Sequence, residues 1–568
     1  MQKSRKKKKN NNLLKVFLSI FLIFIVIMTI FLYKRYSYTN ERMSLDLYFG
    51  SKNDEVIVYY NDKKQALQND NENQIKKVVS IYRNEEIYLP YSFVKSVLNN
   101  VFYYETDTQS IIYSNAKSTD SFSERDYYKN KPCLLLLDEP YISISFIKEK
   151  SDIRYDFYET DSYKRVFIYD NWEEESFAIL KGNEKARYRG GNKSPILSDL
   201  NKGDIVKVLD KMNKWCLVKT PDGFLGYIRN KKMEEEYIET PKSEFIKEKI
   251  NYKTFDKKVL IAFHQLWKVA NKDDLQKLIV NMQNVNVLSP TWFKIADNQG
   301  NIISLADNSY VEEAHLRGLQ IWPTINNFDI ENIITKTLFS SHNARSKIIN
   351  TLVSYANDLN LDGINLDIED ISREAQDDYV QFIRECSIAF KKINKYISVC
   401  QSIPSEQNDR YHFSDVAKVV DYMVLMLYDE HTSNGGSSGP VSSLNFVKRG
   451  IELSLSQMDN DRLVIALPFY TRVWTTDSNG KISAKSMGAK AFDEQKELLE
   501  LDEYTWDSIE AYNYASKTKN GTKTEVWVED IKSLNAKMKE VENANVAGTA
   551  AWKLGMEMDG FFSLIDLN

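Results

Sequence analysis

Three polar side chains alternate with aliphatic ones in residues 362–369, which read Asp-Gly-Ile-Asn-Leu-Asp-Ile-Glu. If this segment is a strand, Asn365, Asp367 and Glu369 share one face, because alternate residues of a strand point to opposite sides. Strands of a parallel sheet are normally apolar on both faces, so burying this polar row costs free energy and indicates a functional site. Neighbouring carboxylates also resist ionising together, which raises the pKa of at least one. The row therefore predicts a general acid, whereas a solvated strand end would explain Glu369 alone.

Two other apolar segments end in groups suited to binding a sugar. Residues 422–429 bring Met426 and the phenol of Tyr428 to one face, and Asp429 follows directly. Residues 548–552 end in Trp552, whose ring is able to stack on a sugar. Alone, the Tyr-Asp pair is a weak signal, and a place in the core is the competing interpretation for Trp552.

The elements that would position these groups are short apolar segments that alternate with amphipathic patterns after residue 258. The expected strands are 259–263, 285–288, 320–324, 363–368, 397–401, 422–427, 463–467 and 548–552. The helical patterns between them include Ile348, Ile349, Leu352, Val353, Ala356 and Leu359, which follow the i, i+3, i+4 spacing of one buried face. This alternation predicts an α/β fold, a (β/α)8 TIM barrel over residues 255–568. Barrel enzymes build their chemistry at the carboxyl ends of the strands, where the groups above fall.

The row at 362–369 resembles the D-G-x-D-x-D-x-E signature of glycoside hydrolase family 18, the chitinase family. The resemblance runs from about Val259 to the carboxyl end, and four motifs follow in the family's order. They are Met426-x-Tyr428-Asp429, Leu467-Pro468-Phe469-Tyr470-x-Arg472-x-Trp474, Trp527-x-Glu529-Asp530 and Trp552. Residues 428–431 and the loop at 439–440 are most similar to the bacterial branch that contains spore and cell-wall hydrolases.

The resemblance implies a retaining mechanism in which the N-acetyl group of the substrate is the nucleophile. Glu369 would protonate the glycosidic oxygen, Asp367 would orient the acetamido nitrogen, and Tyr428 would hold the acetamido oxygen. Trp552 would form the floor beneath the sugar. The residues expected to bind the substrate are Asp362, Asn365, Met426, Asp429, Arg472 and Trp552. No cofactor is implied, and the five scattered His residues make a metal site improbable.

Residue 365 departs from the family's pattern, which has Asp at this position. The amide of Asn365 is able to hydrogen-bond Asp367, but it cannot hold a proton or a charge. We hypothesise that the site stays active with less electrostatic crowding and a shifted pH optimum.

The amino end is cationic and apolar, and the remainder is acidic. Nine Lys and Arg and no acid lie in the first 35 residues, so the net charge of −5 divides into +9 there and −14 beyond. An acidic body argues against nucleic-acid binding, which requires a basic surface. Residues 16–33 lack both charges and a small-residue cleavage site, which favours an uncleaved anchor over a cleaved secretory signal. We predict a basic cytoplasmic segment at 1–12, a transmembrane anchor at 13–33, and an extracellular remainder.

Two modules are expected between the anchor and the barrel. Residues 45–172 hold an α+β repeat, because Tyr-Glu-Thr-Asp at 104–107 recurs at 158–161, each time before a strand pattern. The repeat resembles the copper amine oxidase N-terminal-like module, but no His precedes position 264, so copper binding is not expected. Residues 177–235 predict a small β-barrel and resemble a bacterial Src-homology-3-like domain. A cell-wall peptide ligand and a spacer role with Trp215 as core are equally good interpretations.

Other signals exclude several classes of site. The four Cys match no disulfide framework or zinc pattern, and Cys386 shares an apolar helix face with Phe382, Ile383 and Phe390, so no disulfide scaffold is expected. The sequence has no phosphate-binding G-x-x-x-x-G-K-[ST] loop, no H-E-x-x-H pair and no G-x-S-x-G elbow.

Together these patterns predict a membrane-anchored, outward-facing glycosidase that hydrolyses β-1,4-linked N-acetylglucosamine glycans, with peptidoglycan favoured over chitin. Two alternatives remain: a catalytically weak or inactive, lectin-like envelope protein, and a scaffold protein in which the barrel is vestigial. The presence of Glu369, Asp367 and Tyr428 together speaks against the lectin.

Overall fold

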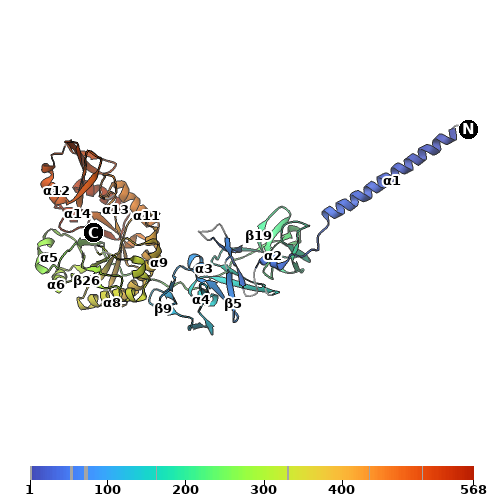
Figure 1. Cartoon of the computed structure of the whole chain (residues 1–568), viewed down its shortest axis with the longest axis horizontal. Coiled ribbons are helices and arrows are strands. Elements are labelled where there is room, and N and C mark those ends of the chain that lie inside the picture. The colour runs from blue at the N-terminus through green and yellow to red at the C-terminus, as the bar shows by residue number, and fades with distance from the viewer. Residues whose placement is uncertain are drawn as a thin grey trace. The chain divides into compact units, whose positions relative to one another are not determined.

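The computed structural model describes residues 3–50, 55–68, 75–77, 79–161, 163–328, 330, 332–433, 435–501 and 503–568. The chain divides into two compact units, and each combines separate stretches of sequence. The first unit consists of Met1–Asn100 and Glu124–Lys247. The second consists of Val101–Ser123 and Glu248–Asn568, and we call it the catalytic unit because it contains the predicted acids Asp367 and Glu369. Figure 1 colours both along the chain.

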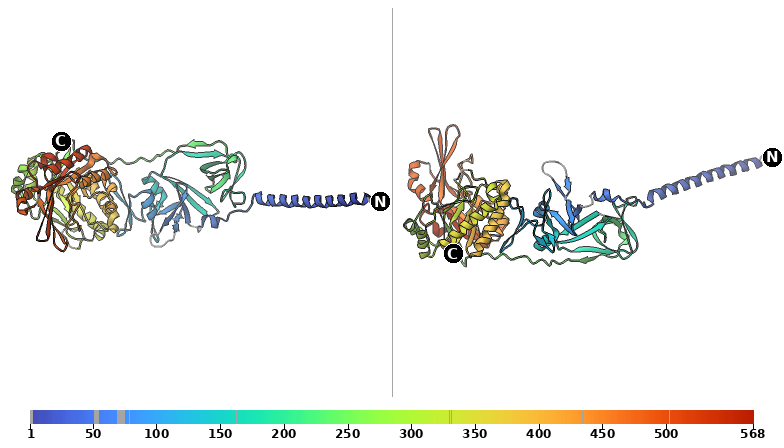
Figure 2. Two further views of the ribbon diagram at one scale, coloured as in Figure 1. Left: turned by 90° about the horizontal axis from the view of Figure 1, so that it is seen from above. Right: turned by 60° about the horizontal axis from the view of Figure 1, so that its bottom comes forward.

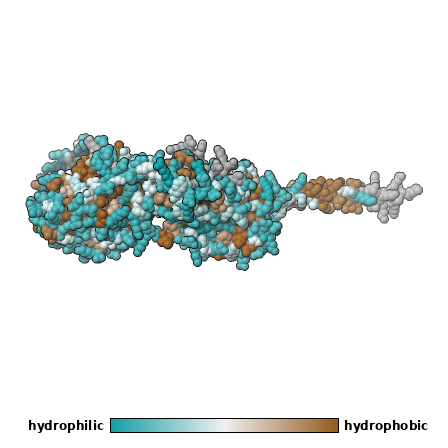
Figure 3. Space-filling view, turned by 90° about the horizontal axis from the view of Figure 1, so that it is seen from below, coloured by the Kyte–Doolittle hydropathy of each residue, from teal (hydrophilic) through white to brown (hydrophobic). Residues whose placement is uncertain are grey.

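The amino-terminal helix α1 (Lys3–Tyr36) contains the predicted anchor. Its segment Leu13–Tyr36 has 24 residues and is long and apolar enough to cross a membrane. The large apolar side chains of this segment are exposed, and they form the brown section of the helix in Figure 3. An isolated apolar helix of this length is typical of a signal anchor or a membrane span.

The predicted repeat is present as a strand, a short helix and a hairpin, twice. The first copy is β6 (Glu86–Pro90), α3 (Tyr91–Phe93) with η1 (Val94–Leu98), β7 (Phe102–Glu105) and β8 (Ser110–Ser114). The second is β13 (Pro140–Ser143), α4 (Ile144–Lys150), β14 (Arg154–Thr160) and β15 (Tyr163–Tyr169). Only the second hairpin pairs with β1 (Glu55–Tyr60), whereas the first forms a separate sheet with β9 (Thr119–Phe122). Residues 101–123 of the predicted module 45–172 belong to the same compact unit as Glu248–Asn568.

The small β-domain has seven antiparallel strands. They are β16 (Glu175–Ile179), β17 (Glu184–Arg187), β18 (Ile196–Leu200), β19 (Ile205–Lys211), β20 (Trp215–Lys219), β21 (Leu225–Arg229) and β22 (Tyr237–Glu239), paired in the order β18-β17-β21-β20-β19-β16-β22. Cys216, Val218 and Ile228 lie in its core. Trp215 points to the other face, because alternate strand residues face opposite sides, and it is half-buried beside Gly190. The interpretation of Trp215 as a core residue is therefore wrong.

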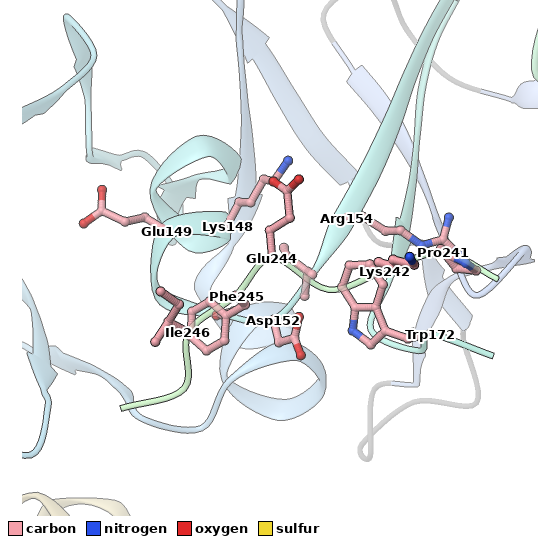
Figure 4. A pocket seen from close by; sticks show the side chains of 12 residues that line it. Lys148, Glu149, Asp152, Arg154, Trp172, Pro241, Lys242, Glu244, Phe245 and Ile246 are labelled. Carbon is pink, nitrogen blue, oxygen red and sulfur yellow. The ribbon is translucent and has the colours of Figure 1, made fainter. Parts of the chain in front are cut away.

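The first unit also has a surface cavity of about 550 Å³. In Figure 4, Trp172 and Arg154 lie on one side of it, and Phe245 and Ile246 lie on the other. None of its lining residues comes from the catalytic unit.

Eight parallel strands form a TIM-barrel-like catalytic domain. They are β23 (Val259–His264), β24 (Val287–Pro290), β27 with β28 (Gln320–Ile321 and Thr324–Asn326), β29 (Gly363–Asp367), β30 (Tyr396–Gln401), β31 (Tyr422–Met426), β32 (Leu463–Pro468) and β38 (Gly548–Trp552). Each pairs with the next, and β38 also pairs with β23. The third strand is split at Trp322-Pro323, where the proline has no N–H to donate. All eight predicted strands are therefore present.

Helices cover the outer face of these strands (Figures 1 and 2). They include α8 (His342–Asp358), α9 (Gln376–Lys392), α11 (Leu444–Leu455) and α13 (Ile531–Asn543). Ile364, Leu366 and Ile368 pack into the core between strands and helices. Phe263 and Val424 pack into a second core inside the ring of strands. The predicted alternation along 363–368 is confirmed, because its aliphatic side chains face the helices.

A five-stranded antiparallel sheet is inserted after β32. It consists of β33 (Tyr470–Thr476), β34 (Ile482–Gly488), β35 (Thr505–Asp507), β36 (Tyr512–Lys519) and β37 (Thr522–Val528). Fully buried Lys537 of α13 pairs with Glu529, and both contact the Tyr512 hydroxyl. Asp530 caps α13 by accepting the Ser533 N–H at 2.9 Å. The Trp-x-Glu-Asp motif therefore joins the insertion to the barrel and is not part of the row of acids.

The sheet of residues 101–123 packs on α8 and α9 through buried polar contacts. The guanidinium of Arg345, which is fully buried, contacts Glu105, and its Nε lies 3.0 Å from Glu385 Oε2. The Tyr103 hydroxyl donates to Asp378 Oδ1 at 2.7 Å. A buried guanidinium between two carboxylates fixes this sheet to the catalytic unit, because separating the pair would leave charges without partners.

We predict that Arg345→Met lowers the free energy of unfolding of the catalytic unit by about 3–5 kcal/mol, because it removes the shared cation from two buried carboxylates. Chemical denaturation of the purified protein measures the change. Arg373→Met is the matched control, because the Arg373–Asp409 pair is exposed and such pairs contribute at most about 1 kcal/mol. Equal losses in both variants would contradict the role of Arg345.

Candidate active site

The carboxyl end of β29 carries the predicted row of polar groups. Asn365 is fully buried, Asp367 is 5 % exposed, and Glu369 lies two residues beyond Asp367 and is half-buried. Asn326 of the neighbouring strand is paired in register with Asp367 and is also buried. The structure thus brings the three predicted groups to one strand end, inside the ring of strands.

Asn327 holds the backbone of the predicted acid. Its Oδ1 accepts the Glu369 N–H at 2.9 Å, and its Nδ2 donates to the Glu369 carbonyl at 2.6 Å. These two bonds join the carboxyl ends of the third and fourth strands. They fix the point from which the Glu369 side chain extends, so Asn327 is a positioning residue.

Asn365 makes its hydrogen bonds to β30. Its Nδ2 donates to Ser398 Oγ at 2.8 Å, and its Oδ1 accepts the Cys400 S–H at 3.1 Å. The expected bond to Asp367 is therefore not the one this side chain makes. Instead, β30 holds the neutral amide that stands where the family has a carboxyl group.

Asp367 is the least compensated group of the site. Its Oδ1 is buried and has no hydrogen-bond partner among the residues that the structure describes. Burial raises the pKa of Asp367 well above its ordinary value, and the charge of Glu369 raises it further. Burial also raises the pKa of Glu369 to about 7, with repulsion from Asp370 and Asp429 adding to the effect. The site therefore holds protons near neutral pH, as a general acid requires.

Tyr428, Met426 and Trp552 lie at the same end of the barrel. All three are half-buried and pack against the inner core. The rings of Tyr428 and Trp552 are stacked, with centroids 6.2 Å apart and planes 21° from parallel. Burial raises the pKa of the Tyr428 phenol, which keeps it protonated and able to donate a hydrogen bond. The structure thus brings an aromatic floor and a donor beside the acids.

Asp429 and Arg472 form a second polar group at this end. The guanidinium of Arg472 lies 2.8 Å from Asp429 Oδ1 and also donates to the His431 carbonyl. The Tyr470 hydroxyl donates to the same carboxylate oxygen of Asp429. Arg472 and Tyr470 both belong to β33, so the inserted sheet holds the loop that follows β31. Arg472, which is a predicted binding residue, therefore also positions the loop that carries Asp429 and His431.

Asp362 does not join this group. It precedes β29 at the amino end of the strand, the opposite end from Asp367. Its Oδ2 accepts the Ile321 N–H at 2.9 Å and lies 2.9 Å from His315 Nε2. The prediction that Asp362 binds the substrate is therefore corrected: its place indicates a structural role between neighbouring strands.

Sequence reasoning did not single out several residues of the site. Asn327 holds the backbone of Glu369, Cys400 contacts the Asn365 amide, and Tyr470 lay inside a quoted motif without a role of its own. The only signal for Asn327 was the Asn-Asn pair at the end of the third strand. All four Cys are buried and free, and Cys386 packs in the outer core as expected. Among the described residues, no three His, Cys, Asp or Glu side chains are placed to hold a metal ion.

Two protein-family models match this chain. The model of the family described as glycosyl hydrolases family 18 matches residues 260–557, which is more than half of the chain. The chain belongs to glycosyl hydrolases family 18. It is therefore a glycoside hydrolase, and the family implies hydrolysis of glycans that contain N-acetylglucosamine. A bacterial SH3 domain model matches residues 189–233, which confirms the small β-domain.

Relatives of this family 18 hydrolase occur in Bacillus. It is 24% identical over 299 residues to the uncharacterized glycosylase YvbX of Bacillus subtilis, covering 50% of this chain and 84% of the relative. It is 24% identical over 259 residues to the cortical fragment-lytic enzyme of Bacillus subtilis, covering 44% and 59%. The crystal structure of the spore cortex-lytic enzyme SleL of Bacillus megaterium has 17% identity and a TM-score of 0.48, covering 58% and 77%.

We predict that Asn327→Ala lowers kcat by about 10- to 100-fold, because a small displacement of a catalytic group costs up to about two orders of magnitude. Steady-state hydrolysis of a chitooligosaccharide measures it. Asn298→Ala is a matched control, because Asn298 makes the same pair of backbone bonds to Asn332 and Ile334. Equal losses of kcat in both variants would contradict the role of the two Asn327 hydrogen bonds in positioning Glu369.

The pH–rate profile tests the role of Asn365. In the wild-type enzyme, kcat/KM should fall as pH rises through about 7, because Glu369 loses its proton there. Asn365→Asp adds a carboxyl group to the row that holds Asp367 and Glu369. Like-charge repulsion then raises the pKa values of Asp367 and Glu369, so the alkaline limb moves to higher pH. Asn535→Asp, on the exposed face of α13, adds the same charge away from the site and should leave the limb unchanged. An unchanged profile in Asn365→Asp would remove the hypothesis.

Proposed function

We propose that this family 18 hydrolase is a membrane-anchored enzyme that cleaves β-1,4-linked N-acetylglucosamine glycans by substrate-assisted, retaining catalysis. The observation that carries the proposal is the buried Asp367 Oδ1, which has no partner among the described residues. An unpaired buried acceptor costs free energy unless a ligand supplies the donor. The N–H of an acetamido group is a donor of the required kind. The proposal includes a closed (β/α)8 barrel as the catalytic domain.

In the first step, the Glu369 carboxyl group gives its proton to the glycosidic oxygen. The bond from that oxygen to the anomeric carbon breaks, and its electron pair stays on the oxygen. The acetamido oxygen of the same sugar forms a bond to the anomeric carbon, while Asp367 holds the acetamido N–H and Tyr428 donates to the acetamido oxygen. Trp552 supports the distorted sugar ring from below. General acid catalysis of this kind contributes about 10²–10⁴-fold to the rate.

In the second step, the Glu369 carboxylate takes a proton from water, and the water oxygen attacks the anomeric carbon. The bond to the acetamido oxygen breaks, which restores the N-acetyl group and retains the anomeric configuration. The positions of Met426, Asp429 and Arg472 beside these groups support contacts with the sugar or with the loop that holds it.

Peptidoglycan is the favoured glycan, because the other parts of the chain suit an enzyme that works on the cell's own wall. We infer a single-pass anchor at 13–33, with the basic residues before it in the cytoplasm and the catalytic domain outside. Trp215, which lies outside the core of the small β-domain, supports a wall-contacting role for that domain. We also propose that the repeat module is a copper amine oxidase N-terminal-like module and that it acts as a spacer.

Release of reducing ends from purified peptidoglycan by the full-length protein tests the activity. Glu369→Gln should lower the rate at least about 100-fold, because glutamine cannot donate the proton. Glu374→Gln is the control, because Glu374 is exposed and lies in the next turn of the chain. Binding of peptidoglycan without turnover by the wild type would favour the lectin-like alternative and end the enzymatic proposal for this substrate.

A further inference from the structure

Lys553 is a cation at the carboxyl end of the barrel that the mechanism above does not use. It directly follows Trp552, and its ammonium group donates to Gln265 Oε1. Gln265 lies just beyond β23, where it continues the inward row of Ile261 and Phe263. Lys553 and Gln265 therefore lie on the β23 and β38 side of the site, beside the aromatic floor.

No carboxylate pairs with this cation among the residues that the structure describes. Lys553 is half-buried, and burial lowers its pKa. Neighbouring His264 adds no second positive charge, since burial lowers its pKa to about 4 and leaves the ring neutral. A half-buried ammonium group whose partner is a neutral amide would be stabilised by a bound anion.

Two exposed carboxylates lie beyond other strands of the barrel. Asp370 and Asp429 are exposed beyond β29 and β31, and both raise the pKa of Glu369. An anionic group on the glycan would be repelled there and attracted toward β23 and β38. On that side, Trp267 offers an indole that is 68% exposed, two residues after Gln265. Such a ring provides an apolar platform for a sugar, and the ammonium group of Lys294 lies 5.4 Å from its centroid.

We propose that Lys553 binds a carboxylate of the glycan and so makes the enzyme prefer anionic over neutral N-acetylglucosamine polymers. This inference rests on the proposed function and names the substrate feature that the site selects. Chitin has no carboxylate. Peptidoglycan has two kinds: the lactyl carboxylate of muramic acid, which is free only where no stem peptide is attached to it, and the carboxylates of the stem peptide. Either presents the same chemistry to an ammonium group.

The test compares kcat/KM of the full-length protein on three substrates of equal glycan length. They are chitotetraose, a peptide-free tetrasaccharide of alternating N-acetylglucosamine and N-acetylmuramic acid, and the same tetrasaccharide with stem peptides. In Lys553→Gln, the ratio of anionic to neutral kcat/KM should fall by about tenfold, as expected for loss of a charge-assisted hydrogen bond. Lys553→Arg should restore most of the ratio. Lys395→Gln, at the amino end of the barrel near Asn360, removes the same charge elsewhere and should leave the ratio unchanged.

Each outcome decides a separate point. A reduced ratio with the peptide-free glycan supports the lactyl carboxylate, and a reduced ratio only with the peptide-bearing glycan supports the stem peptide. Equal ratios in the wild type and Lys553→Gln, with turnover retained, overturn the role of Lys553 and leave the proposed function intact. No turnover of any substrate by the wild type overturns the proposed function and this inference with it.

Discussion

The cost of burying two acids at the end of one strand governs this site. Asp367 ends β29 and Glu369 lies two residues beyond it, where Asn327 holds its backbone, so the chain keeps the two acids close together. Burial raises both pKa values, and that same penalty keeps a proton available for the glycosidic oxygen. The surroundings hold the pair without neutralising it, since Asn365 is neutral and no described side chain bonds Asp367 Oδ1. A cation placed there would stabilise the fold but lower the pKa on which the acid depends.

The elements around this pair hold the backbone and leave the reactive atoms free. Asn327 binds the main chain of Glu369, and β30 binds the amide of Asn365. On the other side, Arg472 and the inserted sheet hold the loop after β31 through Asp429 and His431. Positioning therefore comes from three parts of the chain, and the apolar packing of the inner and outer cores on either side of the strands keeps those parts rigid.

The sequence predicts the barrel and its acids well because both depend on local periodicity. Alternation along 363–369 places the acids, and all eight predicted strands occur, because apolar strands and amphipathic helices carry distinct periods. Asp362 was counted among the substrate-binding residues through the family resemblance, although it precedes the expected strand at 363–368 and lies at the amino end, away from the acids. Periodicity cannot show partners distant in sequence. The contact of Arg345 with Glu105 crosses 240 residues, and it moves 101–123 into the catalytic unit.

Charge on this protein acts at two ranges with different consequences. The body after residue 35 carries −14, so its long-range field gives no attraction toward an anionic wall. That field also decays within about 8–10 Å at physiological ionic strength, so it cannot orient a glycan polymer that is many times longer. The proposed anchor would supply proximity without charge, and the sign of the surface would then be free to serve solubility. A single half-buried cation such as Lys553 is screened far less than the surface charges, so it can select an anionic sugar that the protein as a whole repels.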